Sequence, residues 1–166
     1  MSIKKAVMML AGASLLMSCG KATERPATYK LDFWICESID IEALKASNII
    51  EKQEEKIRYL DSKYTLEKNQ DNEPVLPNTR ANYILTNVNN NWMVTSIYIT
   101  DPNIKIYGLS MKSSDQKIDS TLKARGYKFL NYHGLYPAYS KDDVEIRIYP
   151  SFISVWASII NAHVVD

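Results

Sequence analysis

The sequence is poor in glycine, cysteine and histidine, and each shortage argues against a class of protein. Its 166 residues include only five glycines, two cysteines and two histidines. So few glycines argue against a glycine-rich phosphate loop, and two cysteines are too few for a disulfide scaffold or a multi-cysteine metal site. The 20 basic and 19 acidic residues nearly cancel, so the net charge does not favour binding to nucleic acid. We therefore expect no nucleic-acid partner and no cofactor.

The composition is otherwise that of an ordinary globular protein. Hydrophobic residues make up 46% of the chain and charged residues 23%, which argues against wholesale disorder. The length suits one compact domain or a duplicated pair of small units, and it is too short for a multidomain enzyme.

The first eighteen residues predict an export signal. Lys4 and Lys5 precede an apolar run over residues 6–17, which is the charge and length pattern of a secretory signal peptide. The run is too short for a membrane-spanning helix, which needs about 20 apolar residues. A buried amino-terminal helix is the alternative.

The four residues that end this run, Leu-Met-Ser-Cys at 16–19, resemble the lipobox of bacterial lipoproteins. The resemblance implies that residues 1–18 are removed and that Cys19 is acylated with diacylglycerol. Cys19 would then anchor the protein to the extracytoplasmic face of a bacterial cell membrane. The Lys-, Asn-, Ile- and Tyr-rich composition favours a Gram-positive surface; in a Gram-negative cell the protein would lie in the periplasm or at the outer membrane.

The domain boundaries follow from this leader. Residues 19–28 are expected to form the lipidated cysteine and a flexible tether, because none of residues 20–28 is a large apolar residue. Nine extended residues span roughly 30 Å, which would hold the body close to the membrane. Residues 29–166 are expected to form a single α+β domain.

The first half of that domain predicts strand, helix and strands in turn. Residues 29–35 alternate as a half-buried strand does, and a three-four apolar spacing over residues 41–64 predicts a helix that Ser47-Asn48 could divide in two. A short strand at 64–66 would precede a polar loop that ends at Arg80. Further strands are expected at residues 83–88, 92–100 and 104–111, the first two joined by a tight turn at Asn89-Asn90-Asn91.

The second half opens on the clearest local signal. The serines at 113 and 114 followed by Gln116 form a capping box, and Gly126 suits the left-handed residue after a helix, so we expect a helix over 114–125. Strands are expected at 127–132, 136–140, 143–149 and 152–160.

Together these elements predict the α+β class, as an antiparallel sheet with two helical segments packed on one face. Ile39-Asp40 with Leu44-Lys45-Ala46 echoes Ile118-Asp119 with Leu122-Lys123-Ala124, one residue out of register. This echo leaves open whether the domain is a duplicated α/β unit.

Residues 97–156 bring a second resemblance. The segment Tyr107-Gly108-Leu109-Ser110-Met111, the capped helix that ends at Gly126 and the strands that follow are similar to the repeat unit of beta-lactamase-inhibitor-like domains. Small lipoproteins of outer-membrane assembly share this layout. A second glycine before the helix, which those families have, is missing here. The resemblance implies a protein-binding or envelope role and carries over no catalytic residue.

The residues that could support catalysis or metal binding are scattered. His133 and His163 lie in no metal-ligand spacing, and no Gly-x-Ser-x-Gly nucleophile motif occurs. The carboxylate pairs Asp142-Asp143 and Asp71/Glu73 suit a hairpin turn and a polar loop. If Cys19 is acylated, Cys36 is the one thiol left, without a disulfide partner, and we expect it to be structural. We therefore expect neither an enzyme nor a metal site.

The aromatic residues are more suggestive. In the last hairpin Val144, Ile146 and Ile148 alternate with Glu145, Arg147 and Tyr149. In the next strand Phe152 and Trp156 lie on the opposite face from the apolar residues Ile153, Val155 and Ala157. The partner-binding residues are therefore predicted to be the following set: Arg147, Tyr149, Phe152 and Trp156. Tyrosine, tryptophan and arginine are enriched at interface hot spots. Tyr132, Tyr136 and Tyr139 would form the rim. The alternative is that another element covers this face and makes these residues core.

Three functions are compatible with these patterns. The first is a membrane-anchored, non-enzymatic lipoprotein that binds an envelope or extracellular protein through this sheet face. The second is a small-ligand carrier or envelope sensor with a closed apolar pocket between helix and sheet. The third, a hydrolase with dispersed carboxylates, would need a cleft that gathers acids far apart in the sequence.

Overall fold

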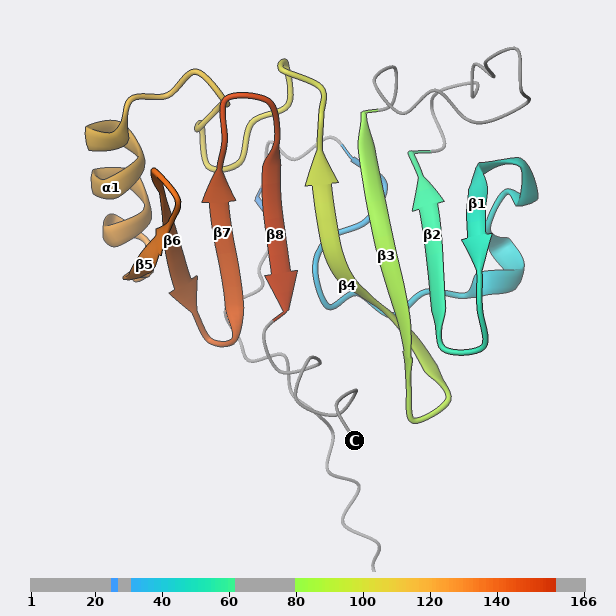
Figure 1. Ribbon diagram of the computed structural model, residues 1–166. Helices are drawn as coiled ribbons and strands as arrows, with labels where there is room; N and C mark the ends of the chain where they lie inside the picture. The colour runs from blue at the N-terminus through green and yellow to red at the C-terminus, as the bar shows by residue number, and fades with distance from the viewer. Residues whose placement is uncertain (1–24, 27–30, 62–79, 158–166) are drawn as a thin grey trace, which may run out of the picture.

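The computed structural model describes residues 25–26, 31–61 and 80–157, and its main feature is one eight-stranded sheet (Figure 1). All neighbouring strands are antiparallel, in the order β1-β2-β3-β4-β8-β7-β6-β5. Two four-stranded meanders therefore lie side by side and meet where the last strand of each pairs with the other.

A short helical segment precedes each meander. The elements of the first meander are η1 (Ile41–Ala43), η2 (Ala46–Asn48), β1 (Ile49–Lys52), β2 (Lys56–Leu60), β3 (Ala81–Val88) and β4 (Asn91–Ile99). Those of the second are α1 (Asp115–Ala124), β5 (Lys128–His133), β6 (Tyr136–Lys141), β7 (Val144–Ile148) and β8 (Ile153–Ala157). The join between them pairs Ser96 with Trp156 and Ile99 with Ile153.

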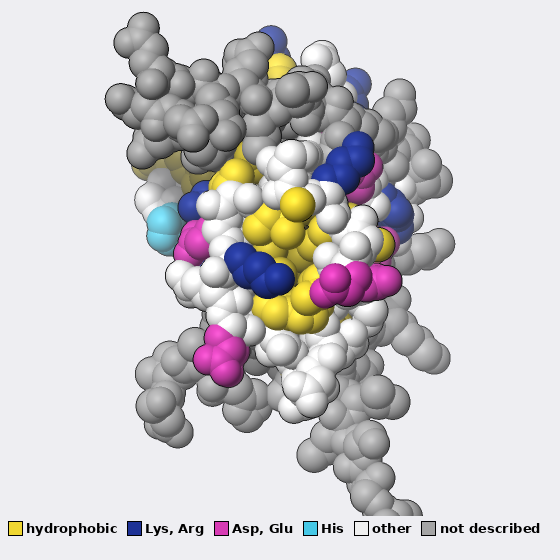
Figure 2. Space-filling view, turned by 90° about the vertical axis from the view of Figure 1, so that its right-hand side faces the viewer, with side chains coloured by type: hydrophobic (Ala, Val, Ile, Leu, Met, Phe, Trp, Pro, Cys, Tyr) yellow, Lys and Arg dark blue, Asp and Glu magenta, His cyan; other side chains and the backbone are white. Residues whose placement is uncertain are grey.

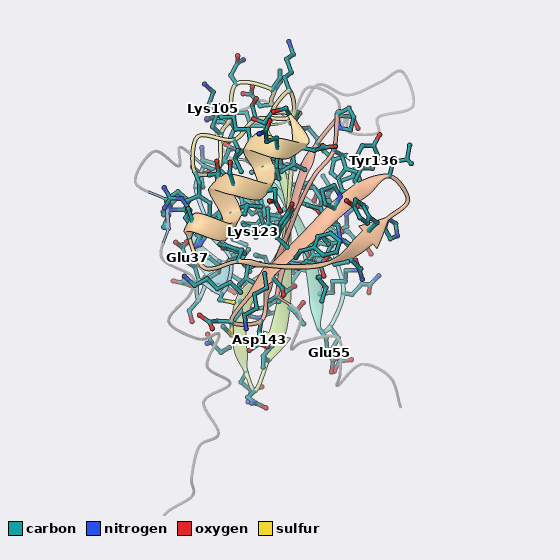
Figure 3. All side chains as sticks on the ribbon, turned by 90° about the vertical axis from the view of Figure 1, so that its left-hand side faces the viewer. Glu37, Glu55, Lys105, Lys123, Tyr136 and Asp143 are labelled. Carbon is teal, nitrogen blue, oxygen red and sulfur yellow. The ribbon has the colours of Figure 1, made fainter. Side chains whose placement is uncertain are left out.

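The hydrophobic core lies on one side of the sheet. Residues 31–48 cross this side, behind the strands in Figure 1, and bury Leu31, Trp34 and Ile35 against them. The loop before α1 adds Ile106 and Leu109 to the core, and α1 itself adds Ile118 and Leu122. In Figure 3, which looks at the molecule from the β5 side, Glu37 and α1 lie on one side of the sheet and Tyr136 lies on the other.

The hairpin of β3 and β4 confirms the strands predicted around the asparagine turn. Asn89 and Asn90 both adopt positive φ, at 52° and 61°. This backbone twist matches that of the flanking strands, and asparagine adopts it more readily than most residues. The strands predicted around residues 127–149, and the start of the one at 152, are confirmed as β5 to β8.

The helix predicted over 114–125 is confirmed as α1, and so is the role of Gly126 after it. The predicted capping box of Ser113 with Gln116 is wrong by one residue, because the N-cap is Ser114 and Lys117 stands three residues on. The Ser114 hydroxyl accepts a hydrogen bond from the Lys117 amide, and Gly126 follows the helix at φ +84°. The amides of Gly126 and Tyr127 donate to the carbonyls of Lys123 and Leu122, at 2.9 and 3.0 Å. This pair of bonds is the Schellman arrangement, which requires a left-handed residue after the helix.

We expect Gly126→Ala to destabilise the protein by about 1–2 kcal/mol, because an L-residue is strained at this φ. A Cβ there would meet only the Lys141 side chain, at 3.6 Å, so the loss comes from the backbone. Gly126→Asn should lose less, since asparagine tolerates the left-handed region. Urea unfolding of the three proteins measures this difference, and equal losses for both variants would contradict the backbone explanation.

The helix predicted over 41–64 is wrong. The chain makes two 3-10 turns, η1 and η2, and then the hairpin of β1 and β2. Arg58 lies opposite Glu51 across the hairpin, with Nη1 and Oε2 3.6 Å apart. Pairing of β2 with β3 adds ladder hydrogen bonds and buries Ile57 and Tyr59, which outweighs a weak helical preference.

Two predicted strands are also wrong where the structure describes them. Residues 31–35 form no strand; the chain runs across the sheet, and the amides of Cys36 and Ile39 donate to carbonyls of β4 at 2.8 Å. Residues 104–111 form turns closed by a bridge between Ile106 and Leu109. The predicted strand at 64–66 and the end of the one at 152–160 fall outside the described residues. Within the described ranges the fold is thus an antiparallel sheet with one α-helix, and the two-helix α+β prediction is met only in part.

One edge of the sheet is strand β1. Figure 2 looks at the β1 edge, where hydrophobic side chains reach the surface between basic and acidic ones. Ile41, Leu44 and Ile49 are half-buried there against the core.

Over the described residues, no helix is both long and apolar enough to cross a membrane.

Candidate binding face

The side of the sheet opposite the core carries the alternate residues of each strand. No described element crosses it in Figure 1, where it faces the viewer. Its side chains are half-buried at most positions, among them Ile84, Tyr98 and Trp156, whereas their neighbours along each strand are buried in the core. This alternation is the one predicted from the sequence, with the core residues on one face of the sheet and a second set of side chains on the other.

Five aromatic rings form a continuous band across this side. We call them, together with Arg147, the aromatic face: Tyr98, Tyr136, Tyr149, Phe152, Trp156 and Arg147. The Tyr98 ring lies 6.3 Å from Trp156 and 6.2 Å from Phe152. Phe152 stacks on Tyr149 at 4.3 Å and 22°, and Tyr149 lies 5.0 Å from Tyr136. Such ring pairs are worth about 0.5–1.5 kcal/mol each beyond the area they bury, so the band is held in place before any partner binds.

Arg147 is the charged centre of the aromatic face. Its guanidinium lies over the Trp156 ring, 5.4 Å from the centroid, and its Nε donates to the Glu145 carboxylate. Burial alone would lower the pKa of Arg147, but its bonds to Glu145 and Tyr149 outweigh this effect and raise it. The side chain is thus charged and fixed in position, with only 9% of the residue exposed.

Burial affects the nearby phenol as well. It raises the pKa of Tyr98, and Tyr149 adds to the rise, whereas the Arg58 charge lowers the pKa in part. Tyr98 is therefore a neutral hydroxyl at physiological pH and offers both a donor and an acceptor. It joins the aromatic band to the hollow that Lys56 and Arg58 of β2 line.

The structure brings together the four residues predicted for partner binding, Arg147, Tyr149, Phe152 and Trp156. Of the three rim tyrosines, it places only Tyr136 beside them. Tyr139 is three residues from Tyr136 on β6, so it points to the opposite side of the sheet and is buried in the core. Tyr132 lies exposed on β5.

Sequence reasoning missed Tyr98, although its signal was present. It stands between Ile97 and Ile99 on β4, and both of these isoleucines are fully buried. The same alternation that separates Trp156 from Val155 therefore places Tyr98 on the aromatic face. What the sequence could not show was that β4 and β8 are neighbours.

A groove continues from the aromatic face toward β1. Two open hollows of about 360 and 400 Å³ share Lys56, Ile84 and Tyr98 in their walls. Charged groups of both signs, including Arg58 and Glu51, line the end nearer β1. Beneath this surface Asn82 Oδ1 and Trp156 Nε1 have no hydrogen-bond partner within the described chain. Unpaired buried polar atoms are rare in stable proteins, so both of these atoms require an explanation.

The remaining predicted residues have no shared site. His133 ends β5 and is exposed, while Asp142 and Asp143 make the β6–β7 turn at φ 43° and 67°. His163, Asp71 and Glu73 lie outside the described residues. In the segments that the structure does describe, no three histidine, cysteine or acidic side chains gather closely enough to hold a metal ion.

Cys36 differs from its prediction. We expected a thiol without a disulfide partner, but the structure has Cys36 in a disulfide. Its backbone has φ 64°, and its side chain packs in part against the core. The sequence contains one other cysteine, Cys19, which lies outside the described residues. A disulfide between these two cysteines and acylation of Cys19 exclude each other.

Comparison with protein-family models, with curated proteins and with solved structures finds no match to this chain.

Proposed function

We propose that this protein is a lipid-anchored, non-enzymatic binding module that holds an envelope or extracellular protein on its aromatic face. The observation that carries the binding role is the half-exposed band of five rings around one charged arginine. The lipobox resemblance at Leu16–Cys19 supports attachment to the extracytoplasmic side of a bacterial membrane, through Cys19.

The physical chemistry of the aromatic face suits a protein partner. Tryptophan, tyrosine and arginine dominate interface hot spots because each buries a large area and also offers a polar group. Here the rings already contact one another, so binding orders few side chains and keeps more of its free energy.

A duplication is part of this proposal. Each meander follows a helical segment, and the two meanders meet at equivalent strands, β4 and β8, as a two-fold arrangement of similar units would. The echo between residues 39–46 and 118–124 supports the same history. The single face that the two units build would then be the binding surface.

We expect Trp156→Ala and Tyr149→Ala each to weaken partner capture about 30-fold, the effect of a hot-spot residue of about 2 kcal/mol. The measurement is affinity capture from envelope extracts on the purified, processed chain, with its stability measured in parallel. Trp92→Ala is the matched control, because Trp92 is half-buried against the core side and away from the aromatic face.

Two results would reject the binding role of this face. Capture that is equal for all three variants would place the partner elsewhere. A loss of several kcal/mol of stability in both aromatic variants would show that these residues are core, as the alternative from the sequence holds.

A small ligand is the second candidate, favoured by the hollow of about 400 Å³ beside Tyr98 and Trp156. Its volume falls in the range of ligand sites. However, it is open and lies on the outer side of the sheet, not between helix and sheet. Capture of a small molecule with no protein would favour this function.

A further inference from the structure

Every large hydrophobic side chain that is exposed in the described part of the chain lies on one hairpin. These residues are Phe129, Leu130, Tyr132 and Leu135, with exposed fractions of 43%, 50%, 66% and 84%. They belong to β5 and to the turn before β6, at one edge of the sheet. Exposed apolar residues scattered singly are normal, but a concentration of this kind marks an interaction surface.

A cleft of about 420 Å³ separates this hairpin from α1. Figure 3 faces this side of the molecule, with α1 and its Lys123 in front of the hairpin. Phe129, Tyr132 and Tyr139 form the hairpin wall. The Phe129 ring lies 5.1 Å from Tyr132 and 5.9 Å from Tyr139, so three rings line one cleft.

The helix wall carries two carboxylates, Asp115 and Asp119, one turn apart on α1. Asp119 Oδ1 accepts a hydrogen bond from the Tyr139 hydroxyl and faces Lys123 Nζ, both at 2.9 Å. Asp119 Oδ2 and the Asp115 carboxylate have no hydrogen bond or ion pair with any described residue. These oxygens are open to solvent, so they can accept hydrogen bonds from a bound donor.

The charges of the cleft favour a cation. Two carboxylates stand against one ammonium group, that of Lys123, and like charges at this helical spacing repel each other. The faces of aromatic rings attract cations, because their π-electron density is negative. A bound cation would relieve the repulsion on α1 and gain the attraction of the rings on β5 and β6.

We propose that this cleft binds an arginine side chain of a protein partner. A guanidinium is planar, stacks on aromatic faces and carries five donors, so it can lie on Tyr132 or Phe129 and still reach both aspartates. An ammonium ion is a compact, strongly hydrated charge and matches this combination less well. Leu130 and Leu135 are exposed on the same hairpin, and a polypeptide that extends past the cleft would cover them, whereas a free cation would not.

This site is independent of the proposed function. Its rings and acids lie on the core side of β5 and β6, whereas Tyr136, Tyr149 and Trp156 lie on the opposite side of the sheet. The protein would therefore have two separate binding surfaces.

The experiment is a titration of the processed chain, labelled at its aromatic rings for NMR, with the peptide acetyl-Leu-Arg-Leu-amide. The matched probe replaces arginine with neutral citrulline, and methylguanidinium tests the free cation. We expect the arginine peptide to shift the Phe129 and Tyr132 signals and to bind more tightly than both other probes. Tyr132→Ala should weaken binding about two- to fivefold, Tyr132→Phe should leave it unchanged, and added salt should weaken it.

Asp115→Asn tests the acid wall and should weaken the arginine peptide but not the citrulline one. Both Tyr132 and Asp115 are exposed, and an unchanged thermal midpoint confirms that these variants fold. Equal binding of the arginine and citrulline peptides, or no shift at all, would overturn the proposal. So would self-association through the hairpin in sedimentation, or binding to anionic vesicles that the arginine peptide does not displace. Trp156→Ala should leave the titration unchanged, so this proposal and the proposed function can fail separately.

Discussion

Trp34→Ala is expected to lower the free energy of unfolding by about 3–5 kcal/mol. Trp34 is only 1% exposed and belongs to the segment that crosses the core side of the sheet without forming a strand. Its ring is therefore a main link between that segment and the strands. A loss of this size is a large part of the roughly 5–15 kcal/mol that a typical domain has.

Urea unfolding at neutral pH measures this effect, and Trp156→Ala provides the comparison. The same substitution on the aromatic face should lose only about 1–2 kcal/mol, because Trp156 is half-buried. If the two tryptophans gave equal losses, the distinction between a core side and a binding side of the sheet would be wrong.

Cys19→Ser is expected to move the protein from the membrane to the soluble fraction, because the proposed anchor is a lipid on this sulfur. Stable anchoring takes more than one acyl chain, which a diacylated cysteine supplies. Fractionation and gel mobility measure the change. An unaltered distribution would contradict the lipobox interpretation.

The state of Cys36 gives this experiment a second readout. A sulfur that carries a lipid cannot also form a disulfide, and Cys19 and Cys36 are the only cysteines of the chain. If Cys19 is acylated, the denatured mature protein should show one reactive thiol without reduction. If Cys36 keeps the disulfide seen in the structure, no thiol should react until a reductant is added.

The second half of the fold could be predicted from sequence because its signals are local. Ser114 and Gly126 bound α1 through hydrogen bonds a few residues apart, and the alternation of Ile146 with Arg147 assigns each strand face. The same alternation grouped Arg147 with Trp156. Interactions of this range depend little on the rest of the molecule.

The first half could not be predicted in the same way. The apolar spacing between Ile41 and Tyr64 fits a helix, and only pairing with β3 makes Ile57–Leu60 a strand. Similarly, nothing local shows that Tyr98 lies next to Trp156, because β4 and β8 come together over more than fifty residues of chain. The helix–hairpin cleft depends on tertiary packing of Asp119 with Tyr139 and has no sequence motif.

The pairing of β4 with β8 also bears on the order in which the protein folds. Within each meander, successive strands are hairpin neighbours or lie one loop apart, so each can form early and quickly. The strand that joins them, β8, follows the other seven in the chain and is therefore made after them. Until then β4 presents an unpaired edge with Ile97 and Ile99 beside it, a template for pairing with other chains. A substitution that weakens the pairing of β8 with β4 should therefore slow folding as well as lower the final stability.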